Sequence, residues 1–457
     1  MTGMPWQDLA TVLNLQNATK LHVWSGLKPW IQVFKKFNQL DRNKLQFYFL
    51  WRLASSHFNK LSQKYYDLWK NEIHPVVVKA DFPEIDSDGD IFQEDCIEET
   101  GRNLRYLAGH LFIQYAFNGI GFIFILLITS LDTQKANAKT MIDSLFDAFK
   151  ERLEELDWMD APTKEESLEK LKNIVRVIGY PEWLSNPKSV VDHYRPLKID
   201  AKKYFENAVQ AQVFTELSPA IQQSRHTSLD RGKTYFGYPW QLNAFHLTDL
   251  VLIQINPGVL QRPVFSELNP MAMNYGGIGT IIAHEITHGF DSVGSLLDSR
   301  GVRRHWMTER AHHELYTRSK CFVNQYNRMK VKLPDGSFVR PNGKKSLPEN
   351  MADGGGMHTS FRAMRKHYGD QVDIYKPNHP KDPFSPAQTF FLSLGQSWCS
   401  EIDSAVTRYM IAHDVHSPNP ARVHGSIANS PEFARAFGCA VGSQMVPRPF
   451  SRMCRAF

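Results

Sequence analysis

Two histidines and a glutamate lie within five consecutive residues of the chain. His284 and His288 are four residues apart, and Glu285 stands between them in the pattern HEITH. Residues at this spacing project from one face of a helix, so the two imidazoles could bind one zinc ion, which favours nitrogen ligands. Zinc lowers the pKa of a bound water to about 7, and the Glu285 carboxylate could accept its proton as a peptide carbonyl is attacked. The pattern indicates metal-assisted hydrolysis, although a chain with 18 histidines can also contain it by chance.

The segment that carries this pattern has the periodicity of a helix. Residues 277–290 read GIGTIIAHEITHGF, in which Ile278, Ile282 and Ile286 recur every four residues. This spacing gives one apolar stripe along a helix, with the two histidines on a different face. We therefore expect the stripe to pack on a core and the histidines to face a site.

A third ligand would complete a catalytic zinc site, which typically has three protein ligands and one open position. The segment SLPENMADGGG offers Glu349, and Asp353 follows one turn later on the same predicted helical face. Taken alone, Ser346 and Glu349 could equally form a capping box, with Pro348 in the first turn. The spacing leaves both interpretations open.

The composition is that of a folded protein with more than one domain. The 457 residues are 42% hydrophobic and 12% aromatic, which is enough for two or three domains with cores. The net charge of +6 comes from scattered basic residues, so we do not expect nucleic-acid binding. The five cysteines include no C-x-x-C pair, which argues against a thiolate zinc site or a redox motif.

The first 180 residues are predicted to be helical. Apolar residues recur at helical spacing in one stretch, namely Met141, Leu145, Phe149, Leu153 and Leu156. Thr163 and Glu166 predict a capping box at the start of the next helix. A domain boundary is expected between residues 182 and 196.

Residues 119–131 (GIGFIFILLITSL) are apolar on all sides, unlike the segments beside them. The run is shorter than the about 20 residues that a membrane-spanning helix needs. We interpret it as a buried helix or an inserted stretch rather than a membrane span. The first 30 residues show no signal peptide, and Asn17 to Thr19 form one glycosylation acceptor triplet.

Several segments together resemble the neprilysin family of zinc metallopeptidases, which includes the endothelin-converting enzymes. They occur in the family's order, as NAFH at 243–246, HEITHGFD at 284–291, ENMAD at 349–353, HSPNPAR at 416–422 and CRAF at 454–457. The resemblance implies a mainly α protein with a thermolysin-like zincin catalytic domain. It places that domain at residues 186–457, after a partial helical lid domain at residues 1–185.

The resemblance gives each residue of the zinc site a role. One zinc ion per chain would be bound by His284, His288 and Glu349. Glu285 would be the general base and later the proton donor. Asp353 and Asp291 would orient the imidazoles by hydrogen bonds. For Asp291, a turn residue at the end of the helix is an equally good interpretation.

The resemblance also implies how a peptide substrate is bound. His416 would donate to the oxyanion of the tetrahedral intermediate, and Arg422 would bind a substrate carbonyl. Asn243 and Ala244 would hydrogen-bond the substrate backbone as an added strand. An apolar pocket would set specificity, and its expected lining is Val259, Val264, Ile281 and Trp398.

We therefore predict a zinc metalloendopeptidase that cleaves short peptides on the amino side of apolar residues. The alternative is a catalytically inactive ectodomain that binds a peptide or a partner protein. Family members are longer, with a membrane anchor and a complete lid, so the chain resembles an N-terminally truncated member. Location outside the cell or at its surface is implied, with membrane contact only through an anchor absent from this chain.

The cysteines match the same family pattern. Cys321 and Cys454 correspond to a family disulfide that lies wholly inside this chain. Cys96, Cys399 and Cys439 match positions whose partners belong to the part of the family sequence that this chain lacks. A Cys321–Cys454 disulfide is therefore expected, and the other three thiols are expected to lack their usual partners.

Overall fold

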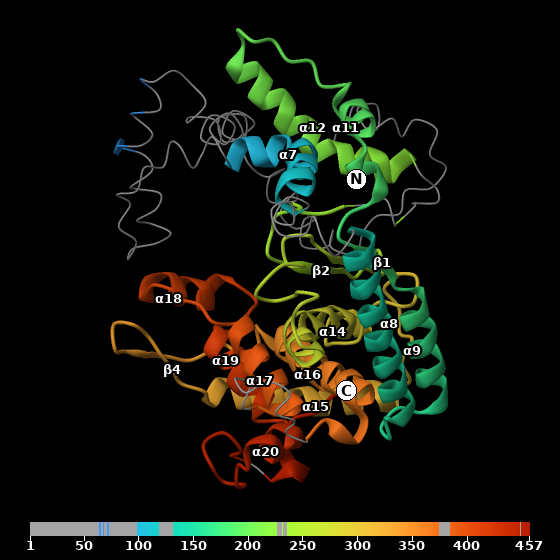
Figure 1. Ribbon diagram of the computed structural model, residues 1–457, viewed down its shortest axis with the longest axis vertical. Coiled ribbons are helices and arrows are strands. Elements are labelled where there is room, and N and C mark those ends of the chain that lie inside the picture. The colour runs from blue at the N-terminus through green and yellow to red at the C-terminus, as the bar shows by residue number, and fades with distance from the viewer. Residues whose placement is uncertain are drawn as a thin grey trace, which may run out of the picture. The chain divides into compact units, whose positions relative to one another are not determined.

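The computed structural model describes residues 98–117, 131–225, 231, 235–373, 384–447 and 449–457, together with residues 64, 67, 71 and 72. These residues are mainly helical, which confirms the predicted fold class (Figure 1). They divide into two compact units, one formed by Met1–Arg105 with Lys188–Asp230 and the other by Tyr106–Pro187 with Arg231–Phe457. Every candidate site residue named above lies in the second unit.

The described part of the first unit contains most of α11 (Pro187–Tyr194) and all of α12 (Tyr204–Arg225). The ring of Phe214 on α12 lies 5.4 Å from that of His193 and 5.8 Å from that of Tyr194, measured between ring centroids. Aromatic contacts therefore join these two helices.

A three-stranded sheet runs through the second unit in the order β1 (Val175–Ile178), β3 (Leu252–Ile255), β2 (Ala244–Leu247). Strand β3 is parallel to β1 and antiparallel to β2. All four residues of β3 are buried, as expected for a central strand. Strand β2 is an edge of this sheet, with Ala244 paired to Ile255. No strand of the described residues pairs with its other side.

Two helices form the centre of the second unit, α14 (Thr280–His288) and α16 (Leu347–Tyr368), which pack against each other (Figure 1). They share a core with α8 (Leu131–Glu155) and α9 (Ala161–Asn173). The further helices around them are α13 (Met271–Asn274), α15 (Glu309–Arg328), α17 (Pro386–Ser397), α18 (Ser404–His413), α19 (Asn419–Ile427) and α20 (Pro431–Phe437). The remaining short elements are α7 (Arg105–Leu111), η3 (Phe112–Phe117), α10 (Glu182–Ser185), η5 (Tyr275–Gly279), η6 (Gly294–Leu296), β4 (Val331–Lys332), β5 (Phe338–Val339), η7 (Gly369–Gln371) and η8 (Phe450–Arg452).

The predicted apolar stripes are confirmed. Ile278, Ile282 and Ile286 are fully buried in the core, as are Leu145 and Phe149 of α8. The predicted capping box at Thr163 is wrong, because α9 begins at Ala161 and the Asp160 side chain accepts from the backbone N–H of Thr163. Thr163 is thus inside the first turn rather than before it.

Glycines let α16 approach α14 closely. A Cβ atom at Gly356 would lie 2.7 Å from the backbone of Thr280 and His284, and one at Gly355 would lie 2.6 Å from the Thr287 side chain. Each glycine inside a helix costs about 1 kcal/mol relative to alanine. The close packing of the two helices requires these residues all the same, because any larger side chain would separate α16 from the histidines of α14.

The boundary predicted between residues 185 and 186 does not coincide with the division into units. Helices α8 and α9 precede it in the chain, but both pack on the same core as α14 and α16. The assignment of residues 1–185 to a lid domain stays a prediction.

Three sequence features lie outside the described residues: the glycosylation triplet at 17–19, Cys96 and the apolar run up to residue 130. Within the described ranges, no helix combines the length and apolar character that crossing a bilayer requires.

Cys321 on α15 and Cys454 near the C-terminus form a disulfide, as expected from the resemblance, while Cys399 and Cys439 are free thiols. The bond links residues 133 apart in sequence, so it closes a long loop of the unfolded chain.

We expect Cys321→Ser to lower the free energy of unfolding by about 2–5 kcal/mol, because the unfolded chain gains conformational freedom. Urea unfolding without reductant measures the change. Cys399→Ser is the matched control, since that exposed thiol has no disulfide to lose. Equal stability of both variants would show that the disulfide contributes little.

Candidate metal centre

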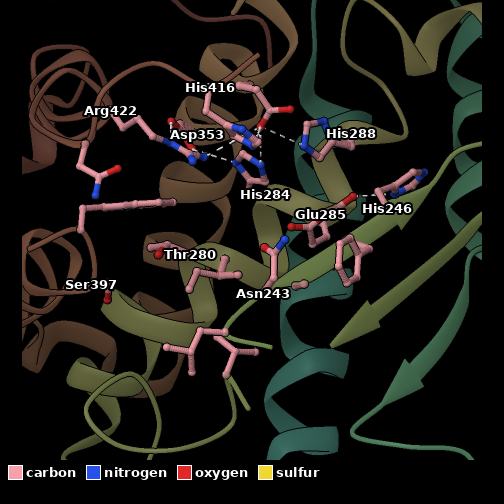
Figure 2. A pocket seen from close by; sticks show the side chains of 18 of the residues that line it. Asn243, His246, Thr280, His284, Glu285, His288, Asp353, Ser397, His416 and Arg422 are labelled. Atoms are coloured by element: carbon pink, nitrogen blue, oxygen red, sulfur yellow. Dashed lines mark hydrogen bonds and ion pairs between the residues drawn. The ribbon is translucent and has the colours of Figure 1, made fainter. Parts of the chain in front are cut away.

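The three predicted zinc ligands lie together between α14 and α16, and Figure 2 shows the two histidines side by side. Glu349 Oε2 is 3.2 Å from His284 Nε2 and 3.5 Å from His288 Nε2. The two imidazole rings are perpendicular, with centroids 4.4 Å apart. One ligand atom from each residue lies within 4.8 Å of the other two, which is close enough for a single metal ion.

The capping-box interpretation of Glu349 does not hold. Ser346 is the residue before α16, with Pro348 in the first turn, but its side chain makes no capping hydrogen bond. Its hydroxyl instead donates to the Asn342 carbonyl. The Glu349 side chain is buried and turned toward the histidines of α14.

The outer nitrogens of both histidines face carboxylates. His288 Nδ1 donates to Asp291 Oδ2 at 2.7 Å, and His284 Nδ1 lies 2.8 Å from Asp353 Oδ1. With Nδ1 protonated in the neutral ring, each Nε2 is a bare acceptor. Two such nitrogens and a carboxylate oxygen therefore converge, and none of the three atoms carries a proton in this state. Three lone-pair atoms of these types are the ligands that a zinc ion binds.

The electrostatics of the site also favour a cation. Burial alone would lower the pKa of His288, but its contacts with Asp291 and Glu349 raise that pKa well above the ordinary value. Burial alone would raise the pKa of Glu349, but His284, His288 and His416 hold it far below the usual range. Positive charge is thus stabilised at this point, whether protons or a metal ion supply it.

Glu285 lies beside the ligands but binds neither histidine. It is buried on α14, and burial raises the pKa of its carboxyl group. A raised pKa suits a group that must accept a proton and later return it near neutral pH. The role of Glu285 as general base stays a prediction.

Arg422 on α19 is held by Asp353. Its Nε and Nη2 donate to the two Asp353 oxygens at 2.8 and 2.7 Å, and its guanidinium lies 3.8 Å from the centroid of the Trp398 ring. Asp353 thus contacts both His284 and Arg422, and it joins the ligand helix α16 to α19. Neither of these two bonds involves the remaining guanidinium nitrogen, Nη1.

His416 follows α18 and is the most exposed histidine of the site. Its Nδ1 lies 2.6 Å from Asp414 Oδ1, and its Nε2 lies 3.2 Å from Glu349 Oε2. Burial alone would lower the pKa of His416, but Glu349 and Asp414 raise it. The two carboxylates therefore favour the imidazolium form, which has a donor on each nitrogen.

A cavity of about 880 Å³ opens onto these residues. Asn243 and Ala244 line it, as do all four residues expected to form the apolar pocket: Val259, Val264, Ile281 and Trp398. Leu394 and Met410 extend the apolar wall, and no motif or spacing in the sequence singles them out.

Two further residues of the site, Asp414 and His246, have no role predicted from the sequence. His246 Nδ1 lies 2.7 Å from the backbone oxygen of Glu285, and burial lowers the pKa of this histidine to about 3. The signal for His246 was its place directly after Asn243, Ala244 and Phe245. Asp414 precedes His416 by two residues, a spacing at which a carboxylate commonly bonds a following backbone N–H.

Comparison with known proteins agrees with the family resemblance that the sequence motifs indicate. Two family models, both described as peptidase family M13, match residues 1–181 and 243–453. Neprilysin-1 of Caenorhabditis elegans is 30% identical over 429 residues, covering 91% of this chain and 52% of the relative. Neprilysin-3 of Drosophila melanogaster is 29% identical over 427 residues, covering 92% and 50%. The chain spans about half the length of these relatives.

Solved structures match the fold. A zinc metalloprotease of Mycobacterium tuberculosis, solved in complex with an inhibitor, superposes with a TM-score of 0.73 at 23% identity, covering 89% of this chain and 56% of that one. PepO of Lactobacillus rhamnosis gives a TM-score of 0.60 at 25% identity, and the match covers 75% of this chain and 50% of PepO. The predicted thermolysin-like fold of the catalytic part is confirmed.

Proposed function

Because the chain belongs to peptidase family M13, we propose that it is a zinc-dependent endopeptidase acting on short peptides. The observation that carries the proposal is the convergence of two histidine nitrogens and the Glu349 carboxylate beside the buried Glu285. His284, His288 and Glu349 would hold one zinc ion. When bound, zinc supplies Lewis acidity, which makes water a better nucleophile and polarises a peptide carbonyl.

The chain's own residues move the protons. Glu285 takes the proton of the attacking water and then gives it to the leaving amine. His416, whose pKa is raised by Glu349 and Asp414, would donate in its protonated form from Nε2 to the oxygen of the former carbonyl. Asp291 and Asp353 fix the orientation of the two ligand imidazoles.

The substrate would lie along the edge of the sheet. Its backbone pairs with the open side of β2 near Asn243 and Ala244, so binding depends little on side chains. Arg422 donates from Nη1 to a substrate carbonyl. The apolar wall formed by Val264, Ile281 and its neighbours receives the side chain on the carboxyl side of the cleaved bond, which favours an apolar residue there.

The disulfide supports a location in the secretory route or outside the cell, where such bonds persist. The described part of the chain contains no feature that favours the alternative of an inactive, peptide-binding ectodomain.

The proposed activity predicts about one zinc ion per purified chain and cleavage of an internally quenched peptide. A chelator should abolish cleavage and added zinc should restore it, because no protein group replaces the metal's Lewis acidity. Rates are measured for two peptides that differ only in the residue after the cleaved bond, phenylalanine or aspartate. Bound zinc without cleavage of either peptide would contradict the proposed activity, and equal rates would contradict the apolar preference.

A further inference from the structure

His246 links the edge strand to the helix that carries the proposed catalytic glutamate. It lies on β2 two residues after Ala244, and its Nδ1 is 2.7 Å from the backbone oxygen of Glu285 on α14 (Figure 2). A carbonyl oxygen can only accept, so Nδ1 is the donor and carries the proton of the neutral ring. The contact joins two segments that are 39 residues apart in the chain.

The Glu285 carbonyl needs a partner from outside the helix. Helix α14 ends at His288, and the last carbonyls of a helix have no partner one turn ahead. The N–H of Gly289, which would continue the ladder to Glu285, bonds to the Ile286 carbonyl instead. His246 therefore supplies the hydrogen bond that the helix end cannot supply.

The ring of His246 is held in a close fit. A Cβ atom at Gly289 would come within 3.3 Å of His246 Cε1, so the glycine provides the room for the ring. On the sheet, His246 is paired with the fully buried Ile253 of β3. The other nitrogen, Nε2, is buried and meets no hydrogen-bond partner among the residues that the structure describes. The polar function of the side chain therefore resides in Nδ1.

We propose that His246 is a positioning residue for peptide cleavage, because it fixes the backbone of Glu285 relative to the strand that would bind the substrate. The inference rests on the proposed function. A peptide paired with β2 and a carboxylate on α14 must be in register for proton transfer, and errors of about 1 Å in such geometry can cost up to about a hundredfold in rate. The hydrogen bond from His246 connects β2 to α14 at Glu285, the proposed general base.

Three substitutions of His246 distinguish the contribution of Nδ1 from that of Nε2. The amide nitrogen of asparagine reaches the place of imidazole Nδ1, whereas that of glutamine reaches the place of Nε2. In His246→Phe an aromatic ring remains at this position, but both nitrogens are lost. We expect His246→Asn to retain kcat within about threefold, and His246→Gln and His246→Phe to lose about tenfold in kcat with little change in KM, as for a residue that acts on the transition state.

Zinc content and amide hydrogen exchange of residues 284–291 and 243–248 are measured for all four proteins. The inference predicts full zinc content throughout and faster exchange in the glutamine and phenylalanine variants only. Wild-type kcat in His246→Phe, rescue by glutamine rather than asparagine, or an equal loss in all three would each overturn it. A wild-type protein that binds zinc but cleaves nothing refutes the proposed function, and the exchange rates then still decide whether His246 holds the end of α14.

Discussion

Glu285→Gln is expected to abolish peptide cleavage while one zinc ion stays bound per chain. Glutamine has the shape of glutamate but cannot accept the proton of the attacking water. Positioned general bases typically contribute about 10²–10⁴-fold to a rate, so activity should fall by about three orders of magnitude. Zinc should remain because Glu285 is not one of the three converging ligands. Initial rates and elemental analysis of the same preparation test both statements.

Glu309→Gln is the matched control for this experiment. Glu309 is an exposed residue at the start of α15 and does not line the cavity, so the same chemical change there should alter neither rate nor zinc content. Loss of zinc from Glu285→Gln would give Glu285 a structural role. Cleavage at the wild-type rate would exclude it as the base.

The local parts of the site could be predicted from the sequence because they follow helical periodicity. His284 and His288 share one face of α14 while Ile282 and Ile286 face the core. The same spacing places Asp353 one turn after Glu349 on α16. In each case, residues four apart lie on one face whatever the helix packs against.

The long-range contacts could not be predicted in this way. The pairing of Arg422 with Asp353 joins residues 69 apart, and neither residue type nor local spacing indicates it. The family resemblance implies that Arg422 binds substrate, but local sequence does not indicate that the buried Asp353 carboxylate accepts from two of its nitrogens. Contacts of this kind depend on how elements pack, which periodicity does not determine.

Helical periodicity also does not determine which helices share a core. The apolar stripe on α8 indicates that this helix packs on a core, but it does not indicate which core. In the structure, Leu145 and Phe149 lie in one cluster with Ile282 and Ile286 of α14. The helical stripe therefore does not show on which side of a domain boundary α8 belongs.

Glu349→Ala is expected to prevent stable zinc binding and to abolish cleavage. The substitution removes one of the three proposed ligands and leaves Nε2 of both imidazoles without its carboxylate neighbour. Asp353→Asn should have a smaller effect, because Asp353 contacts a ligand rather than the metal, and such changes typically cost about 10–100-fold in metal affinity. Competition with a chelator of known affinity, followed by elemental analysis, ranks the zinc affinities of the wild-type protein and the two variants.

Thermal unfolding with and without zinc shows whether Glu349 binds the metal or only forms ion pairs with the histidines. If Glu349 binds the metal, zinc at 100 times its dissociation constant stabilises the wild-type protein by about 2.7 kcal/mol and should stabilise Glu349→Ala much less. If Glu349 only pairs with protonated histidines, zinc should stabilise both proteins equally. In that case the contribution of Glu349 would instead depend on pH. Because its pKa is held below the ordinary value, that contribution is present above the ordinary glutamate pKa and is lost as the pH falls below it.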